Sequence, residues 1–195
     1  MASGTATASY DMRFDSGRTC LDLVATTHPE ERLGSAERLR AWIAGSGLVP
    51  EGTPLGAVDE AWLVACHELR GHIERLVSGE LDGRPADADL ARVNALALHA
   101  PPAPRAVRTE DGSLLRRLHG PLLRAPLLAA VARDALELLT DPVARACLRR
   151  CEGDNCPIVY LDTSRGRRRR WCSSEVCGNR ERVARHRRRA ALARA

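Results

Sequence analysis

The clearest hydrophobic pattern in the chain is a stripe of apolar residues at helical spacing between residues 59 and 77. Side chains three and four positions apart share one face of an α-helix, so the stripe predicts an amphipathic helix over Asp59–Val77. Ser78-Gly79 follows directly and is expected to end this helix. The stripe consists of Trp62, Leu63, Cys66, Leu69, Ile73, Leu76 and Val77.

Two shorter segments on either side of this stripe also have helical patterns. Ser35 is a candidate N-cap for a helix through Trp42, and glycines around residues 45–47 would stop that helix. A second helix is predicted over about residues 87–98, before a proline-rich break. Its inward-facing residues should be Leu90, Val93, Leu96 and Ala97.

Two further helices are predicted before the C-terminal quarter of the chain. One begins at Pro121 or Pro126 and reaches Leu139. The other is short, with Asp141 as N-cap and Pro142 at its first position, where proline is tolerated. It leads into the C-terminal region without a flexible linker, so we expect that region to pack on the rest of the chain.

A β-hairpin is predicted between the helix at about residues 87–98 and the helix that reaches Leu139. Residues 106–109 and 114–116 flank the sequence Glu-Asp-Gly-Ser, and Asp-Gly is typical of a tight hairpin turn. Near the N-terminus, Tyr10–Phe14 alternates weakly and predicts a short strand, and Thr19–Thr27 is a mostly apolar, strand-like run. The fold class expected is α+β, with a predominantly α-helical domain over residues 10–146 and one small β-hairpin.

Composition narrows the class of protein. Hydrophobic residues make up 44% of the chain but aromatic residues only 3%, so the core must rest on Leu, Val and Ala. No run of 18 apolar residues occurs, and neither a membrane span nor a membrane partner is expected. Residues 1–9 are small and polar and do not resemble a signal peptide. We therefore expect a disordered tail over 1–9 and a cytoplasmic location, where disulfides are disfavoured.

Four cysteines near the C-terminus have the spacing C-x4-C-x15-C-x4-C. Two close thiol pairs separated in this way are typical of a tetrahedral structural zinc site, in which four thiolates leave no position open for water. Buried thiols or a redox pair are the alternatives. One structural Zn²⁺ is predicted at Cys151, Cys156, Cys172 and Cys177, and the remaining three cysteines, Cys20, Cys66 and Cys147, are predicted to be core thiols.

The segment around these cysteines predicts a small module over residues 147–192. Pro157–Leu161 has the pattern of a strand, residues 162–166 would turn the chain, and Arg167–Trp171 would return toward Cys172. A helix is expected from about Asn179 to Leu192. A hairpin followed by a helix is typical of treble-clef-like zinc modules, which need the metal to fold because they bury little apolar area.

Charge is divided unevenly along the chain. Residues 145–195 contain 15 arginines and 5 acidic residues, a net charge of +10, whereas residues 1–144 contain 15 arginines and 20 acidic residues, a net charge of −5. Arginine forks match phosphate oxygens, so the basic module predicts DNA as a partner. A solvated face, or a face for an acidic protein or anionic surface, is the alternative. The candidate DNA-contacting residues are Arg167, Arg168, Arg169, Arg170, Asn179, Arg180, Arg182, Arg185, Arg188 and Arg189.

Asn179 and Trp171 of this module have a structural role as an alternative to DNA contact, and one ion pair is expected. Asn179 would either contact DNA or cap the last helix. Trp171 is expected to pack over the metal site rather than stack on a base. Glu181 and Arg185 have the spacing of an i, i+4 ion pair.

The C-terminal segment resembles the CGNR zinc finger, which is named for the four residues found here as Cys177-Gly178-Asn179-Arg180. The resemblance covers residues 147–190 and includes both cysteine pairs, residues 157–165 and residues 169–172. Arg182 stands where that family usually has Lys, and Ser174 where it often has Met. Neither position is a predicted metal ligand.

The rest of the chain resembles ABATE, the domain usually found ahead of this finger, described as a candidate stress-induced transcription regulator. Residues 14–17, 20–26 and 39–43 are the basis of this resemblance. It implies a DNA-binding transcription regulator. Ala25 replaces an Asn common in the family, and Ser16 replaces a Gly, so a ligand role of that Asn would not carry over.

The N-terminal domain has no catalytic constellation, glycine-rich phosphate loop or nucleophile elbow, and we expect no enzyme activity. Asp22, inside its apolar run, would either cap a helix or turn near Thr26 or line a pocket for a small-molecule effector with Trp42 and Trp62. The sequence thus predicts a regulator whose zinc module contacts DNA and whose N-terminal domain senses a ligand or mediates assembly. The alternative is a zinc-stabilised protein–protein interaction module without DNA binding.

Overall fold

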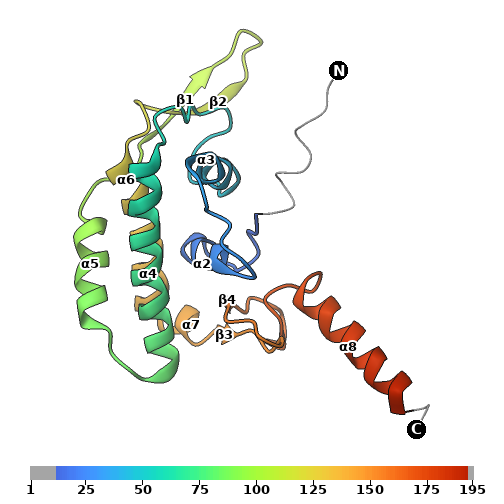
Figure 1. Ribbon diagram of the computed structural model, residues 1–195. Coiled ribbons are helices and arrows are strands. Elements are labelled where there is room, and N and C mark those ends of the chain that lie inside the picture. The colour runs from blue at the N-terminus through green and yellow to red at the C-terminus, as the bar shows by residue number, and fades with distance from the viewer. Residues whose placement is uncertain (1–11, 193–195) are drawn as a thin grey trace.

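The computed structural model describes residues 12–192 of the 195-residue chain. A helical body fills the first two thirds, a β-hairpin projects from one end of it, and a small module with a long final helix lies at the other end (Figure 1). The disordered tail predicted over residues 1–9 lies outside the described residues, as does the start of the strand predicted at residues 10–14. The described part of that segment, residues 12–14, does not form a strand, so this prediction was wrong.

Helix α4 (Glu60–Asp82) is the longest helix of the described chain and buries the predicted apolar stripe. The Asp59 side chain caps its N-terminus by accepting a hydrogen bond from the Trp62 backbone N–H. The helix does not end at Ser78-Gly79 as predicted. It continues to Gly83, whose φ of 65° closes it, and the Arg84 N–H bonds back to the Gly79 carbonyl. A glycine in the left-handed conformation is the stronger stop signal because other residues rarely adopt it.

Helices α5 (Asp87–Ala97) and α6 (Arg124–Thr140) pack beside α4 (Figure 1). Helix α6 buries one side along most of its length, whereas α5 buries only Val93 fully. Leu96 and Ala97 pack partly against the core, as predicted, but Leu90 is 38% exposed and was wrongly predicted to face inward. Helix α5 thus lies at the edge of the bundle and covers α4 and α6 with a narrow stripe.

The apolar run at residues 19–27 forms α2 (Thr19–Val24) and a 3₁₀ turn, η1 (Ala25–Thr27), rather than a strand. Residues 20–24 are all buried. A short run that is buried on every side has no periodicity to distinguish helix from strand. The Cys20 N–H donates to the Asp134 carboxylate of α6 at 2.8 Å. Helix α3 (Ala36–Gly45) follows, capped by Ser35 and ending at Gly45 as expected.

Strands β1 (Pro104–Arg108) and β2 (Leu114–Leu118) form the predicted antiparallel hairpin, with Gly112 at φ 86° in its turn. All residues of both strands are exposed except Leu118, which is half-buried. The hairpin projects from the helical body (Figure 1).

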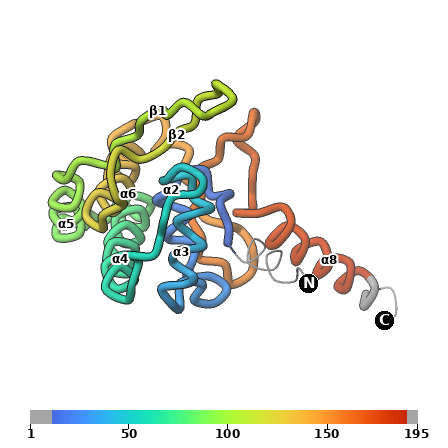
Figure 2. Tube along the Cα trace, turned by 90° about the horizontal axis from the view of Figure 1, so that it is seen from above, coloured from blue at the N-terminus to red at the C-terminus, as the bar shows by residue number. Residues whose placement is uncertain are grey.

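The C-terminal module begins after α7 (Pro142–Arg145), whose first turn is capped by Asp141 as predicted. Its hairpin pairs β3 (Leu148–Arg150) with β4 (Val159–Leu161). The prediction that Arg167–Trp171 forms the partner strand was wrong, because the strand before the first cysteine takes that place. Arg167 lies in a turn with φ 48°. Helix α8 (Cys177–Leu192) begins two residues earlier than predicted and extends away from the body (Figure 2).

The module shares the core of the helical body. Cys147, Leu148, Val159 and Leu161 belong to the same hydrophobic cluster as α2, α4 and α6. The other two predicted core thiols, Cys20 and Cys66, are buried there too. A second, smaller cluster joins Ala25 of η1 to five buried residues of the module, which are Cys151, Ile158, Tyr160, Cys172 and Cys177. None of the helices in the described part of the chain is long and apolar enough to cross a bilayer.

Candidate metal centre and basic surface

Four cysteines from separate segments of the module converge at one point. Cys151 follows β3, Cys156 lies in the next loop, Cys172 follows Trp171, and Cys177 opens α8. Their sulfur atoms all lie within 4.8 Å of one another. The Cys156–Cys172 and Cys172–Cys177 sulfur pairs are 3.7 and 3.5 Å apart. A tetrahedral zinc with bonds of about 2.3 Å separates its sulfurs by about 3.8 Å, so the donors fit this ion.

The loop between the first two cysteines leaves little room for a side chain at Gly153. A Cβ atom there would lie 3.2 Å from the Cys177 Cβ and 3.4 Å from the sulfurs of Cys151 and Cys177. The Gly153 N–H donates to the Cys151 sulfur at 3.4 Å, and Asn155 has φ 55°. A glycine and a residue that tolerates the left-handed conformation let this loop wrap closely around the thiols.

Three further residues direct N–H donors at the cysteine sulfurs. The Cys172 backbone N–H lies 3.2 Å from the Cys151 sulfur, and a guanidinium nitrogen of Arg180 lies 3.4 Å from that of Cys177. Two nitrogens of Arg13 lie 3.5 and 3.6 Å from the Cys172 sulfur, and one of them also donates to the Cys172 carbonyl at 3.1 Å. Such donors stabilise thiolates over thiols and orient metal ligands.

Hydrogen bonds within the cluster separate the acidities of its thiols. Bonds from Cys156 and Cys172 hold the pKa of Cys151 far below its usual range, and the bond to Cys151 raises the pKa of Cys156. The same kind of bond to Cys151 raises the pKa of Cys172 to about 11, with Arg13 acting against this rise. Four thiols packed this closely cannot all ionise without a cation between them, and a divalent metal supplies that charge.

Two family models cover almost all of the described chain. Residues 17–142 match ABATE, described as "Putative stress-induced transcription regulator". The chain belongs to the ABATE family. Residues 147–190 match the CGNR zinc finger, and both matches agree with the resemblances drawn from the sequence. A search of curated proteins found no match.

The finger match and the cysteine geometry together establish one structural zinc site formed by Cys151, Cys156, Cys172 and Cys177. All four tetrahedral positions are filled by the protein, so the site leaves none for a substrate. Neither family description is that of an enzyme.

The predicted DNA-contacting residues do not form one uniform surface. Arg169 is half-buried: its guanidinium lies 4.5 Å from the centroid of the Tyr160 ring and donates to the carbonyls of Asp15, Trp171 and Cys172. Arg170 pairs with Glu152 at 2.5 Å and lies over the Trp171 ring. These contacts hold the segment before Cys172 in place. Trp171 packs against the cysteine cluster, as expected.

Most of the arginines on α8 are directed to solvent. Asn179 and six arginines of this helix are exposed. Arg180 contacts the Cys177 sulfur, and Arg182 donates to the Ser174 carbonyl at 3.2 Å. The ion pair that Glu181 makes is with Arg188, at 3.1 Å, rather than with Arg185 as predicted. The exposed arginines are Arg180, Arg182, Arg185, Arg187, Arg188 and Arg189.

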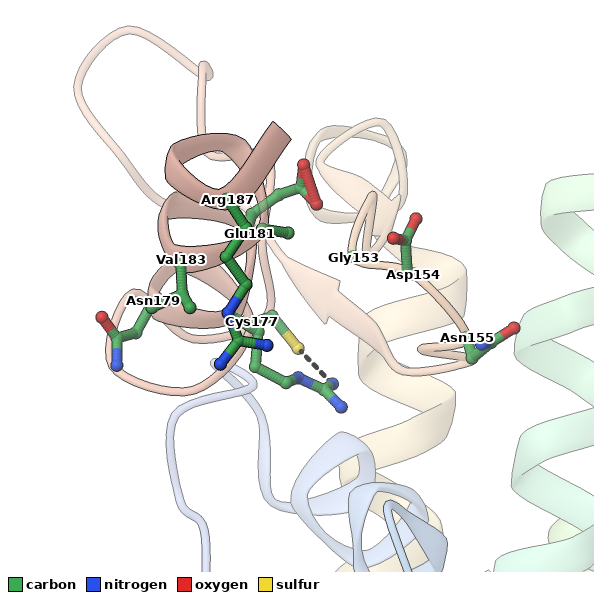
Figure 3. Close-up of a pocket in the computed structure, with 10 residues that line it drawn as sticks. Gly153, Asp154, Asn155, Cys177, Asn179, Glu181, Val183 and Arg187 are labelled. Carbon is green, nitrogen blue, oxygen red and sulfur yellow. Dashed lines mark hydrogen bonds between the residues drawn. The ribbon is translucent and has the colours of Figure 1, made fainter. Parts of the chain in front are cut away.

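A pocket of about 430 Å³ separates the first turns of α8 from the loop that carries Gly153 (Figure 3). Val183 and Ala184 line it from the helix, and Asp154 and Asn155 from the loop. It lies directly beside Cys177. The exposed helix is thus joined to the finger through its first two turns, where Arg180 contacts the Cys177 sulfur and Arg182 the Ser174 carbonyl.

Asp22, Trp42 and Trp62 are buried but do not share a pocket in this structure. Trp42 is 1% exposed and Trp62 8%, both within the main core, and the pockets described here are lined by other residues. The Asp22 carboxylate accepts a hydrogen bond from the Ser16 N–H at 2.9 Å. Burial raises the pKa of Asp22 to about 6. The hydrogen bond from Ser16 to Asp22 therefore holds the segment before α2 in place.

Arg13 is the residue near the metal that sequence reasoning missed. It lies more than a hundred residues from the cysteines and has no motif around it. A signal existed only in retrospect: an arginine directly precedes the Phe-Asp-Ser-Gly segment on which the ABATE resemblance partly rests. Contacts over this sequence distance need the fold before they can be seen.

Proposed function

We propose that this chain is a transcription regulator whose zinc finger binds DNA through α8 and the turn that precedes Cys172. The observation that carries this proposal is the projecting helix α8, whose exposed arginines are largely unpaired by acidic residues in the described chain. An α-helix fits the major groove of B-DNA, and arginine forks bind both phosphates and guanine edges. The family description of a transcription regulator supports the same function.

The structure favours some of the predicted arginines over others as DNA contacts. Arg182, Arg185 and Arg189 lie at i, i+3 and i+7 and therefore share one side of α8. Arg167 and Arg168 are exposed in the turn before the finger's second cysteine pair. In contrast, the Arg169 guanidinium lies over the Tyr160 ring and that of Arg170 pairs with the Glu152 carboxylate. Arg182 donates to one carbonyl, but its side chain stays exposed and pairs with no carboxylate in the described chain. We assign the first five residues to DNA, and Arg169 and Arg170 to holding the finger together.

The experiment that tests this proposal is a fluorescence anisotropy titration of a mixed-sequence 30-bp duplex with the zinc-loaded protein. Binding should weaken steeply between 50 and 200 mM salt, because each neutralised phosphate releases counterions. The variant R182A/R185A/R189A should bind more weakly on every sequence. Its plot of log affinity against log salt should lose a slope of about 3.

The matched control removes three exposed arginines that lie outside the finger, as R84A/R92A/R116A. It changes the net charge by the same amount but leaves α8 intact. Equal weakening by both variants would show that only net charge matters and would overturn the assignment of α8. The absence of any duplex binding at 50 mM salt would overturn DNA binding itself. It would leave an acidic protein as the partner, to be sought by capture after nuclease treatment.

A further inference from the structure

A second pocket lies far from the zinc finger, between the inner face of the β1–β2 hairpin and the loop at residues 52–57. Its volume is about 660 Å³, which falls in the range of small-molecule sites. Gly52, Thr53 and Gly56 contribute from the loop, and Arg105, Val107 and Arg117 from the hairpin. Figure 1 places this hairpin at the opposite end of the helical body from β3, β4 and α8.

Two guanidinium groups converge on this pocket from adjacent strands. Arg105 and Arg117 are directly opposite each other in the strand register, so their side chains share one face of the hairpin. Like charges directly opposite in a sheet are destabilising. In the part of the chain that the structure describes, neither arginine has a carboxylate within ion-pairing distance.

Arg117 is already held in place for a ligand. One of its guanidinium nitrogens donates to the Glu51 carbonyl, at 3.2 Å, in the neighbouring loop. This bond ties the hairpin to the loop and fixes one guanidinium at the pocket edge. Arg117 also donates to the Arg116 carbonyl at 3.3 Å, and the other N–H groups of the pair are open to solvent. An anion between the two arginines would accept hydrogen bonds from them while cancelling their repulsion.

The rest of the lining is apolar. Val107 shares the hairpin face of the two arginines and is 37% exposed, and Leu122 closes the pocket from the segment before α6. Pro54, Pro121 and Leu118 complete this wall. A pocket with paired guanidiniums at one edge and apolar walls matches a molecule with one anionic head and an apolar body, and it does not match a strongly hydrated polyanion such as a nucleotide.

We propose that this pocket binds an amphipathic monocarboxylate, with the carboxylate between Arg105 and Arg117 and the apolar part against Val107 and Leu122. The planar guanidinium fork pairs with a carboxylate through two parallel hydrogen bonds. Binding at this site is independent of DNA binding. Only its meaning as the effector site of a regulator rests on the proposed function.

The test uses hexanoate as the probe, titrated into the full-length zinc-loaded protein without DNA and followed by ¹H–¹⁵N NMR. Two control ligands separate the parts of the recognition: acetate carries the charge without the apolar body, and 1-hexanol carries the body without the charge. Saturable shifts are expected for the hairpin and residues 52–57 with hexanoate, at least tenfold tighter than with either control. Equal binding of acetate and hexanoate would overturn the amphipathic ligand class.

Three variants test the site itself. R105Q/R117Q should weaken hexanoate binding at least tenfold, whereas R108Q/R116Q removes two charges from the opposite face of the same strands and should leave it unchanged. G56L should also weaken binding, because Gly56 lines the pocket and a Cβ there meets no atom within 4 Å, so leucine adds bulk at the pocket wall without a clash. Unchanged binding in R105Q/R117Q and G56L, with hairpin resonances retained, would overturn the site whatever the outcome of the DNA titration.

Discussion

At the residue scale, Arg13 connects the start of the described chain to the metal site. Its side chain is only 8% exposed, and its nitrogens contact both the sulfur and the carbonyl oxygen of Cys172. A buried guanidinium beside a thiolate offsets part of the negative charge that four cysteines bring to one zinc ion. Arg13 therefore belongs to the metal site although it lies in the helical domain's leading segment.

Replacing Arg13 with Gln should weaken zinc binding about 10- to 100-fold, the usual effect of removing an outer-shell partner. Competition with a chromophoric chelator measures this affinity directly. Arg13→Lys keeps the positive charge but lacks the guanidinium fork. Its zinc affinity should lie between those of the wild type and Arg13→Gln. Arg92→Gln, on the exposed side of α5, is the control and should bind zinc as wild type does. Wild-type affinity in Arg13→Gln would show that the contact contributes nothing to the site.

Asp22 should make the free energy of unfolding depend on pH. Burial raises its pKa to about 6 in the folded protein, above the ordinary value of 3.8. The folded state then holds the proton more tightly, so this group's contribution is fully present below pH 4 and is lost as pH rises through 6. Asp22→Asn keeps an acceptor for the Ser16 N–H and removes the buried charge.

Urea unfolding at a series of pH values, with zinc in excess, measures this effect. Asp22→Asn should be more stable than wild type at pH 7.5, by up to about 3 kcal/mol for a shift of about two pKa units. The advantage should shrink as pH falls to 5. An advantage of the same size at both pH values would show that the carboxyl is not the titrating group.

At the element scale, the end of α4 depends on one backbone conformation. Gly83 has φ 65°, and no atom lies within 4 Å of the Cβ that alanine would add there. The cost of Gly83→Ala is therefore conformational rather than steric, and we expect about 1 kcal/mol of lost stability by urea denaturation. Gly34→Ala is the matched control. A Cβ added at Gly34 also meets no atom within 4 Å, and the φ of Gly34 is not positive. This substitution should therefore change the free energy of unfolding by less than about 0.5 kcal/mol.

Elements with a strong periodic or capping signal could be predicted from the sequence, and those whose identity depends on a partner could not. Helix α4 has a long stripe, α3 and α7 have their caps, and β1–β2 has its Asp-Gly turn. The buried run of α2 has no periodicity, because α4, α6 and the finger cover it on all sides. Strand β3 has only three residues, Leu148–Arg150, and two of them are arginines, so nothing local distinguishes it as the partner of β4.

The residues of the site likewise fall into those that the sequence predicts and those that it does not. The four zinc ligands follow from spacing because metal coordination restricts which cysteines can meet. The basic residues could be recognised as a group, but whether an arginine faces solvent or the protein could not. Arg169 and Arg185 both lie in arginine-rich segments, yet the first lies over Tyr160 and the second is exposed. Only the path of the chain around the cysteines distinguishes them.

At the scale of the whole molecule, the finger is a part of the protein's core rather than an appendage. Leu148 and Leu161 of its hairpin lie in the main hydrophobic cluster, and Ala25 of the helical domain packs against the cysteines. The Leu161 N–H also bonds to the Ser16 carbonyl at 2.8 Å. Loss of the metal should therefore loosen the contacts that hold α2 as well as the finger.

Chelation of zinc should lower the melting temperature of the whole chain in a single transition, because the folded metal site and the helical core stabilise each other. Circular dichroism at 222 nm with and without EDTA measures this directly, since α4 and α6 contribute far more helical residues than α8 of the finger. Each 1 kcal/mol lost should lower the midpoint by roughly 2–4 °C for a chain of this size. A finger that folded independently would instead leave the main transition in place and remove only the signal of α8.

An L148A variant, which deletes a side chain that the finger contributes to the shared core, separates the two cases. With the coupling proposed here, it should lower both the midpoint and the zinc affinity, whereas independent units would show a change in only one of them.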